Sequence, residues 1–203
     1  MKKCASDLTL IIGIILAHLL LFFTFKDKSV FWYMLTASML LLISYSIVKE
    51  NFDDHASFIN FLSYGIGSGL VLFGVFLAGN GLIDGLHLPF KNDVNKLYNR
   101  FSPTEIWHYI VLILVIIPGE EIFWRGFVQK RISRHLNRTL SIAIAALLYA
   151  SVNIYSEFMI LPFAAFISGI YWGFLYAWKK SISLVIVSHL VFNLFLLVFM
   201  PLK

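Results

Sequence analysis

The chain has 203 residues, of which 60% are hydrophobic and only 13% are charged. Charge this sparse excludes an ordinary soluble domain and is typical of a helical membrane protein with several spans. The net charge of +5 would suggest nucleic acid as the partner of a soluble protein, but here the basic residues lie in short loops and set topology, so no nucleic-acid partner is expected. A single cysteine, Cys4, excludes an internal disulfide framework and a thiolate metal cluster.

Seven apolar runs predict an all-α bundle of transmembrane helices surrounded by the lipid bilayer. The connection 80–102 carries glycine, proline and scattered charges, and is expected to be a loop with a short interfacial helix. Residues 1–101 are interpreted as N-terminal helices and 102–203 as a catalytic helical core, within one integral membrane domain. The expected spans are 8–25, 30–48, 58–79, 103–128, 140–155, 158–178 and 182–201.

The first three spans carry few polar groups. His18 is alone in the first span and is expected to serve helix packing or a hydrogen bond. In the third span Gly65, Gly67, Ser68 and Gly69 favour close approach of another helix backbone. Four more histidines at loops or helix ends are expected to be solvated: His55, His87, His108 and His135.

The fourth span is predicted to begin at Ser102-Pro103, with Ser102 as the cap and Glu105 at the third helical position. It contains Glu120, Glu121 and Arg125 in an apolar stretch. Each charge at mid-bilayer costs about 2.5–3.5 kcal/mol on insertion scales, so these three are expected to face the protein interior and to mark a functional site.

Residues four apart share a helical face, so Glu121 is expected to pair with Arg125. Glu120 points elsewhere, about 100° round the helix, and is left free. A free carboxylate beside a second one in a low dielectric is a suitable general base. Pro118 and Gly119 predict a kink or an exposed carbonyl beside it.

Basic residues gather at one end of the predicted bundle, which identifies that end as cytoplasmic. The N-terminus is then in the cytoplasm, the C-terminus outside, and the protein a multi-pass protein of the cell membrane. Glu120 lies about 25 Å beyond Pro103 at 1.5 Å per residue, so the site is expected to open toward the cytoplasmic side. The basic residues at this end are Lys2, Lys3, Lys49, Lys130, Arg131, Arg134, Arg138, Lys179 and Lys180.

Two later spans add polar pairs, again four residues apart. Tyr149 and Asn153 lie in the fifth span, and His189 and Asn193 in the last. The second pair can donate hydrogen bonds to one oxygen, or its imidazole can ligate a metal. Interhelical hydrogen bonding is the alternative role for both pairs.

These three motifs in order, EExxxR, an aromatic with a polar residue four later, and HxxxN, resemble the CPBP family of intramembrane proteases. The family is related to the CAAX prenyl endopeptidase of eukaryotes and is also called the Abi family. The resemblance covers about 102–201. The family's second motif is usually Phe-x-x-x-His, whereas here Tyr149 and Asn153 stand in those places, and asparagine is a poor zinc ligand that accepts no proton.

The resemblance implies an intramembrane endopeptidase that cleaves a membrane-associated peptide or protein. Glu120 would activate water, Glu121 with Arg125 would support it, and His189 with Asn193 would hold the oxyanion. The alternative within the family is a metalloprotease with zinc on Glu120 and His189, although the zinc motif HExxH is absent.

Two other functions remain open. The first is a catalytically degenerate relative, marked by Asn153, that binds a membrane partner, for example in bacteriocin self-immunity. The second is a small transporter that relays protons through Glu120 and Glu121, which the apolar character of the other spans disfavours.

Overall fold

The computed structural model describes residues 7–52, 54 and 56–202, so that Lys2, Lys3, Cys4 and His55 lie outside the described residues. The fold is all-α as predicted, and no strand occurs in the described ranges. The α-helices are α1 Leu8–Lys26, α2 Phe31–Lys49, α3 Phe58–Gly85, α4 Lys91–Phe101, α5 Ile106–Val111, α6 Ile117–Glu121, α7 Lys130–Ser133, α8 Arg138–Asn153, α9 Ile160–Lys179 and α10 Ile182–Leu194. Short 3-10 turns and π-helical segments join or extend several of them.

Within the described part of the chain, seven helical segments are long and apolar enough to cross a membrane, as predicted. The fourth of these, Ile106–Ser133, runs through α5, α6 and α7 without a break. The third is longer than predicted, because α3 continues to Gly85 and ends only where His87 adopts a positive φ of 51°. The expected interfacial helix in the connection is α4.

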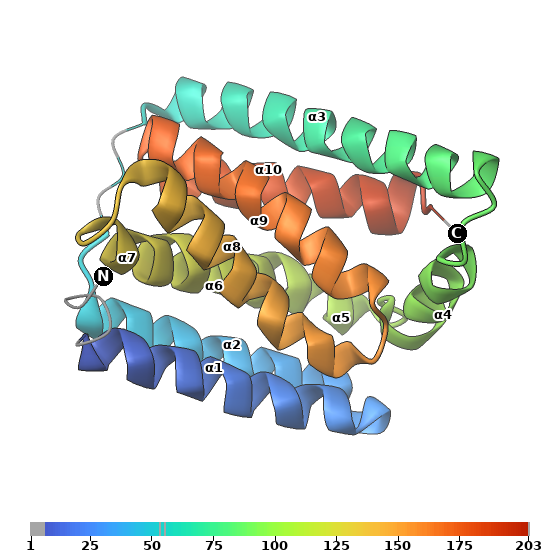
Figure 1. Cartoon of the computed structure of the whole chain (residues 1–203), viewed down its shortest axis with the longest axis horizontal. Coiled ribbons are helices and arrows are strands. Elements are labelled where there is room, and N and C mark those ends of the chain that lie inside the picture. The colour runs from blue at the N-terminus through green and yellow to red at the C-terminus, as the bar shows by residue number, and fades with distance from the viewer. Residues whose placement is uncertain (1–6, 53, 55, 203) are drawn as a thin grey trace.

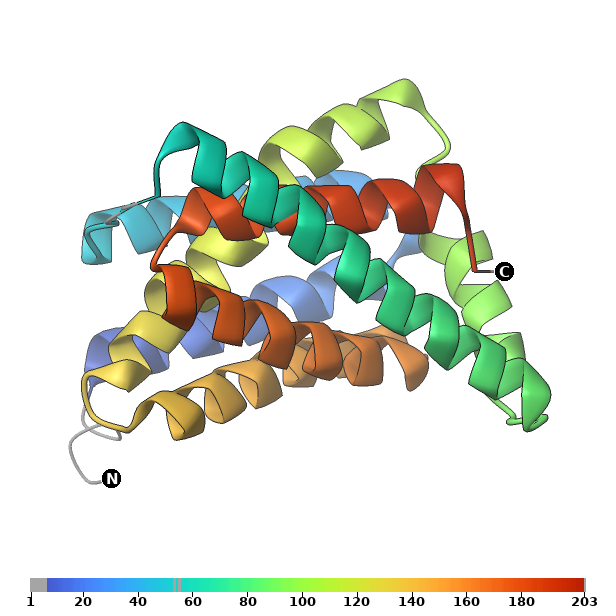
Figure 2. The ribbon, with the colours of Figure 1, turned by 90° about the horizontal axis from the view of Figure 1, so that it is seen from above.

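The helices pack in pairs along nearly their whole lengths. In Figure 1, α1 and α2 form one edge of the bundle, α3 and α10 the opposite edge, and α8 and α9 lie across the front. Figure 2 shows α3 crossing over α10. The fourth span runs through the middle and contacts α2, α8 and α10, so its polar residues lie between the other helices.

The predicted start of the fourth span is wrong by three residues, because the helix begins at Ile106. Ser102 has the extended conformation (φ −63°, ψ 144°) that a following proline favours. The imidazole of His108 then turns back and accepts the backbone N–H groups of Thr104 and Glu105, each at 3.1 Å. His108 is therefore buried, stacked on Trp32 at 4.6 Å between ring centroids, and the expectation that it is solvated is also wrong.

His18 has the hydrogen-bonding role predicted for it. Its Nδ1 lies 2.9 Å from the Tyr155 hydroxyl and its Nε2 lies 3.2 Å from Ser151 Oγ, which joins α1 to α8. The remaining described histidines that were expected to be solvated are exposed: His87 and His135.

Small residues of α3 permit its close packing on α10. A Cβ atom on Gly69 would lie 2.5 Å from the carbonyl oxygen of Ser188, and one on Gly65 would lie 2.7 Å from Val187. A Cβ on Gly67 would meet nothing within 4 Å. The close approach expected of this stretch is confirmed for Gly65 and Gly69, which lie four apart on one face.

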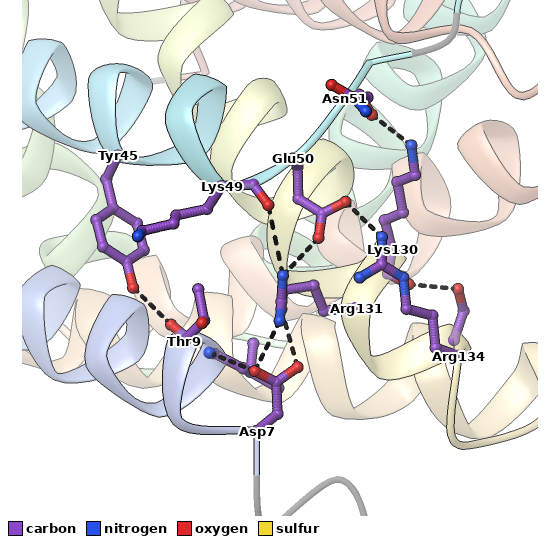
Figure 3. Close-up of polar contacts among 11 residues, drawn as sticks. Asp7, Thr9, Tyr45, Lys49, Glu50, Asn51, Lys130, Arg131 and Arg134 are labelled. Atoms are coloured by element: carbon purple, nitrogen blue, oxygen red, sulfur yellow. Dashed lines mark hydrogen bonds and ion pairs between the residues drawn. The ribbon is translucent and has the colours of Figure 1, made fainter.

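The end of the bundle at α7 is held by an ion-pair network, drawn in Figure 3. Arg131 donates to both oxygens of Asp7, at 2.8 and 2.9 Å, and to Glu50 at 2.7 Å. Arg134 binds the other oxygen of Glu50 at 2.6 Å. The hydrogen bond from Arg131 holds the pKa of Asp7 below its usual value. The network ties the start of α1 and the end of α2 to the fourth span.

Candidate active site

The fourth span departs from α-helical geometry on both sides of the two glutamates. Leu112–Ile116 and Ile122–Gln129 are π-helical, and only Ile117–Glu121 between them is α-helical. Pro118 lacks an N–H, and the widened turn before it is closed by a bond from the Ile117 N–H to the Leu112 carbonyl. π-helical turns often accompany functional sites. The irregular backbone expected at Pro118 is thus a widened helix.

Gly119 allows this irregular segment to lie against α2. A Cβ atom at Gly119 would lie 3.0 Å from the Cβ of Met39 and 3.2 Å from Ile43. The contact fixes the depth of Glu120, which lies midway along the 28-residue segment Ile106–Ser133. Glu120 therefore lies further from the basic end of this segment than its apolar pattern indicates, because the helix begins later and continues to Ser133.

Glu121 is the centre of the polar cluster. Its side chain is 0% exposed and its Oε1 accepts hydrogen bonds from Arg125 Nη1 at 3.2 Å and from His189 Nδ1 at 2.7 Å. The predicted pair with Arg125 is present, and the bond to His189 was not predicted from the sequence. Since an ionised carboxylate only accepts, His189 carries its proton on Nδ1, and its Nε2 faces away from Glu121.

Arg125 is enclosed by aromatic rings as well as by its carboxylate. Its guanidinium carbon lies 4.8 Å from the centre of the Tyr149 ring and 5.4 Å from that of Trp172. Only 2% of its side chain is exposed. Cation–π contacts of this kind are stronger where water is excluded, so they help to offset the cost of burying the charge.

Glu120 lies on a different side of the helix and is the more accessible of the two glutamates. Its side chain is 19% exposed, and its Oε2 lies 3.7 Å from Nε2 of His189. The Tyr149 side chain is beside it. Glu120 and the free nitrogen of His189 thus face one another across a gap that is too long for a direct hydrogen bond.

His189 is held on its other face by a residue that the sequence did not single out. The Trp172 ring stacks on it with 3.9 Å between centroids and 27° between planes. The indole N–H of Trp172 lies 3.2 Å from Ser188 Oγ, which also bonds the Ser68 hydroxyl at 3.0 Å. A buried indole N–H needs an acceptor. This requirement could have marked Trp172 as a residue with a polar partner, but the sequence does not show which helix supplies the acceptor.

The two predicted asparagines have different surroundings. Asn193 lies one turn beyond His189 on α10 and lines the same cavity as Glu120. Asn153 also lines this cavity, but its amide nitrogen donates to the Tyr149 carbonyl in its own helix at 2.8 Å. The structure therefore places all six predicted residues around one cluster, with one of the two amide N–H groups of Asn153 already engaged.

The cavity in front of Glu120 has a volume of about 750 Å³ and a mostly aliphatic and aromatic lining. It extends from Glu120 and His189 toward α4, and its walls come from the half of each helix that is nearer to α4. The basic end lies at α7, opposite α4 in Figure 1. The cavity thus opens away from the basic end, and the membrane face that it meets stays a prediction. The direction in which the cavity opens depends on the relative positions of several helices, which the hydrophobic pattern of a single helix does not determine.

The predicted metal ligands Glu120 and His189 do face each other. However, the described residues contain no group of three His, Cys, Asp or Glu side chains arranged to hold an ion. His189 Nδ1 and Glu121 Oε1 are engaged with each other, and asparagine replaces the histidine at position 153. Zinc usually has three protein ligands even in catalytic sites, so this donor set does not fit zinc.

The fold and the site define a multi-pass helical membrane protein with a buried cluster of glutamates, arginine and histidine at the end of an apolar cavity. Residues 102–195 match the family model of the Rce1-like type II CAAX prenyl endopeptidases, so that over this segment the chain is similar to that family. No curated protein and no solved structure matches the chain.

Proposed function

We propose that the protein is an intramembrane endopeptidase that hydrolyses a peptide bond of a membrane-embedded or lipid-anchored substrate with water activated by Glu120. The observation that carries this proposal is the approach of Glu120 to His189 at the inner end of the cavity, 3.7 Å apart, while Oε1 of Glu121 is bonded to Arg125 and His189 behind them. One carboxylate is thus available for proton transfer and the other is committed to orientation.

In the proposed reaction, Glu120 accepts a proton from a water molecule in the cavity. The water oxygen bonds to the scissile carbonyl carbon, and the carbonyl oxygen becomes an oxyanion. When the tetrahedral intermediate collapses, the C–N bond breaks and the proton on Glu120 passes to the leaving nitrogen. A positioned general acid and base of this kind contributes roughly 10²–10⁴-fold to the rate.

His189 and Asn193 are proposed to stabilise the oxyanion. In the imidazolium form both ring nitrogens donate, so Nδ1 stays bonded to Glu121 while Nε2 donates into the cavity. Arg125 pairs with Glu121 and balances one negative charge of the cluster. The Asn193 amide supplies the second donor from the next turn of α10.

The test compares Glu120→Gln with wild type at matched expression, by mass spectrometry of protein termini enriched from membranes. Substrate termini present only with wild type are expected, because glutamine keeps the shape of the side chain but accepts no proton. Glu157→Gln, at an exposed glutamate, is the control and is expected to process normally. Normal processing by Glu120→Gln would sink the assignment, and reconstitution with a purified substrate excludes a downstream protease.

The second candidate is a non-catalytic relative that binds a membrane partner. The bond from the Asn153 amide to its own helix favours it, because this side chain supplies no imidazole to the site and one of its two amide N–H groups is already used. In that case Glu120→Gln would leave the termini unchanged, and the partner would still be recovered with the variant by affinity capture. Loss of capture with Glu120→Gln would count against this reading.

A further inference from the structure

We propose that the substrate is an apolar, membrane-inserted segment that enters from the face of the membrane opposite the basic end, past α4, and that this face is extracytoplasmic. That the segment entering the cavity is a substrate rests on the proposed function. The route itself rests on the cavity, on the closed packing of the basic end and on the distribution of charge.

At the basic end, the described residues leave no path to Glu120. Phe123 and Phe127, which follow Glu120 on the fourth span, are both 0% exposed. The ring of Phe52 lies directly over Gly126 and would clash with a Cβ atom there. Outside these rings, the network of Asp7, Glu50, Arg131 and Arg134 joins α1, α2 and the fourth span. Aromatic packing and ion pairs thus close this side.

The α4 end has the opposite construction. α4 places its apolar side over the cavity, and its residues in the lining are Val94, Leu97, Tyr98 and Phe101. Two of its charged side chains form ion pairs, Lys91 with Asp84 at 3.0 Å and Arg100 with Glu157 at 2.9 Å. A short helix with one apolar and one charged face is suited to lie in the membrane interface.

Tyr98 attaches α4 to the C-terminal end of the last span. The Tyr98 hydroxyl donates to the Leu196 carbonyl at 2.8 Å and accepts the Leu202 N–H at 3.2 Å. Leu97, in contrast, faces the cavity from α4 without lying at the cluster. A bulky group attached at position 97 would therefore fill space at the α4 end of the cavity, through which an apolar segment reaches Glu120.

The occupant follows from the depth and the lining of the cavity. Glu120 lies at mid-span, and the space leading to it is bounded mainly by aliphatic and aromatic side chains. A polar soluble peptide would lose its hydration there without gaining hydrogen bonds, whereas an apolar segment already in the bilayer loses none. The scissile bond is then reached within the membrane.

The charge distribution assigns the two faces. The α7 end carries more lysine and arginine than the α4 end, and short loops rich in these residues stay in the cytoplasm. The described residues concerned are Lys49, Lys130, Arg131, Arg134, Arg138, Lys179 and Lys180 at the α7 end, and Lys26, Lys28, Lys91, Lys96 and Arg100 at the α4 end. The mouth of the cavity therefore faces away from the cytoplasm.

The first experiment determines the side of α4 without any use of activity. Asn99→Cys on α4 and Ser133→Cys on α7, both at exposed positions, are each made in a Cys4→Ser background. Intact bacterial cells are treated with a membrane-impermeant maleimide. Asn99→Cys is expected to react in intact cells, and Ser133→Cys only after the membrane is broken. The reverse pattern would overturn the extracytoplasmic assignment.

The second experiment tests the path. Leu97→Cys and Asn99→Cys are each assayed for substrate processing before and after reaction with a bulky maleimide. Modification of Leu97→Cys is expected to abolish that variant's processing, whereas modified Asn99→Cys, two residues away on the outer face, keeps the rate it had before modification. Full processing by modified Leu97→Cys would overturn the route past α4.

The outcomes separate the route from the proposed function. If Glu120→Gln abolishes processing but modified Leu97→Cys remains active, the proposed function stands and the route fails. If wild type processes nothing that Glu120→Gln does not, the proposed function fails, and the maleimide labelling still decides which face the cavity opens to.

Discussion

Arg125→Met is expected to destabilise the protein strongly, because it leaves the Glu121 carboxylate buried with one partner fewer. Arg125 is 2% exposed and Glu121 is 0% exposed, so water cannot replace the lost partner. Removing one member of a buried ion pair costs about 3–5 kcal/mol. His189 keeps its 2.7 Å bond to Glu121, which places the expected loss at the lower end, about 3 kcal/mol.

The assay is reversible unfolding by SDS titration in mixed micelles, followed by tryptophan fluorescence. The double variant Glu121→Gln with Arg125→Met removes both charges and is expected to lose clearly less than the sum of the two single variants. The matched control is Glu157→Gln, which breaks the exposed pair with Arg100 and is expected to cost about 0–1 kcal/mol. A loss under about 1 kcal/mol for Arg125→Met, or additive effects in the double variant, would refute the buried-pair argument.

Three further predictions follow from packing, from charge and from the site. Gly69→Ala is expected to force α3 away from α10, because its Cβ would lie 2.5 Å from a backbone oxygen. Gly67→Ala, whose Cβ would meet nothing within 4 Å, should be neutral or stabilising by about 0.8–1.0 kcal/mol in thermal unfolding. Equal effects of the two substitutions on stability would contradict this packing argument. Because the pKa of Asp7 is lowered in the folded state, Asp7 stabilises the fold above its unfolded pKa of about 3.9, and this contribution is lost as the pH falls through the folded pKa. Asp7→Asn should therefore show a smaller fall of melting temperature at acid pH than wild type. The same dependence of melting temperature on pH in both proteins would argue against this role of Asp7. Trp172→Phe keeps a ring on His189 but loses the 3.2 Å bond to Ser188, whereas Trp172→Leu loses both. The kcat for processing should therefore fall less in Trp172→Phe than in Trp172→Leu, and KM should be unchanged in both. Identical kcat values for the two variants would exclude a positioning role for the ring.

The fold was predictable because lipid imposes a strong rule on sequence. Apolar segments long enough to span a bilayer must be helical, so the spans and their order are visible in the composition. Helix ends were less visible. The start at Ile106 depends on His108 folding back onto Thr104 and Glu105, and the end at Ser133 includes the basic residues Lys130 and Arg131.

The site was predictable to the extent that helical spacing determines neighbours. Glu121 and Arg125 are four residues apart, and their ion pair follows from that spacing even through a π-helical segment. The approach of Glu120 to His189 joins residues 69 positions apart, and was expected only through the resemblance of the three motifs to a known family. The Trp172 ring on His189 had no motif to reveal it.

The sequence by itself determined that the chain is a helical membrane protein with buried charges, because a bilayer tolerates such residues only as interior partners. It also determined which glutamate pairs with Arg125, since that contact lies within one helix. Only the tertiary structure decided that Glu121 also holds His189, that Glu120 lies at mid-span and that the cavity opens toward α4. Each of these depends on the relative positions of different helices, which arise from packing at residues such as Gly69 and Gly119 and not from the periodicity of any one segment.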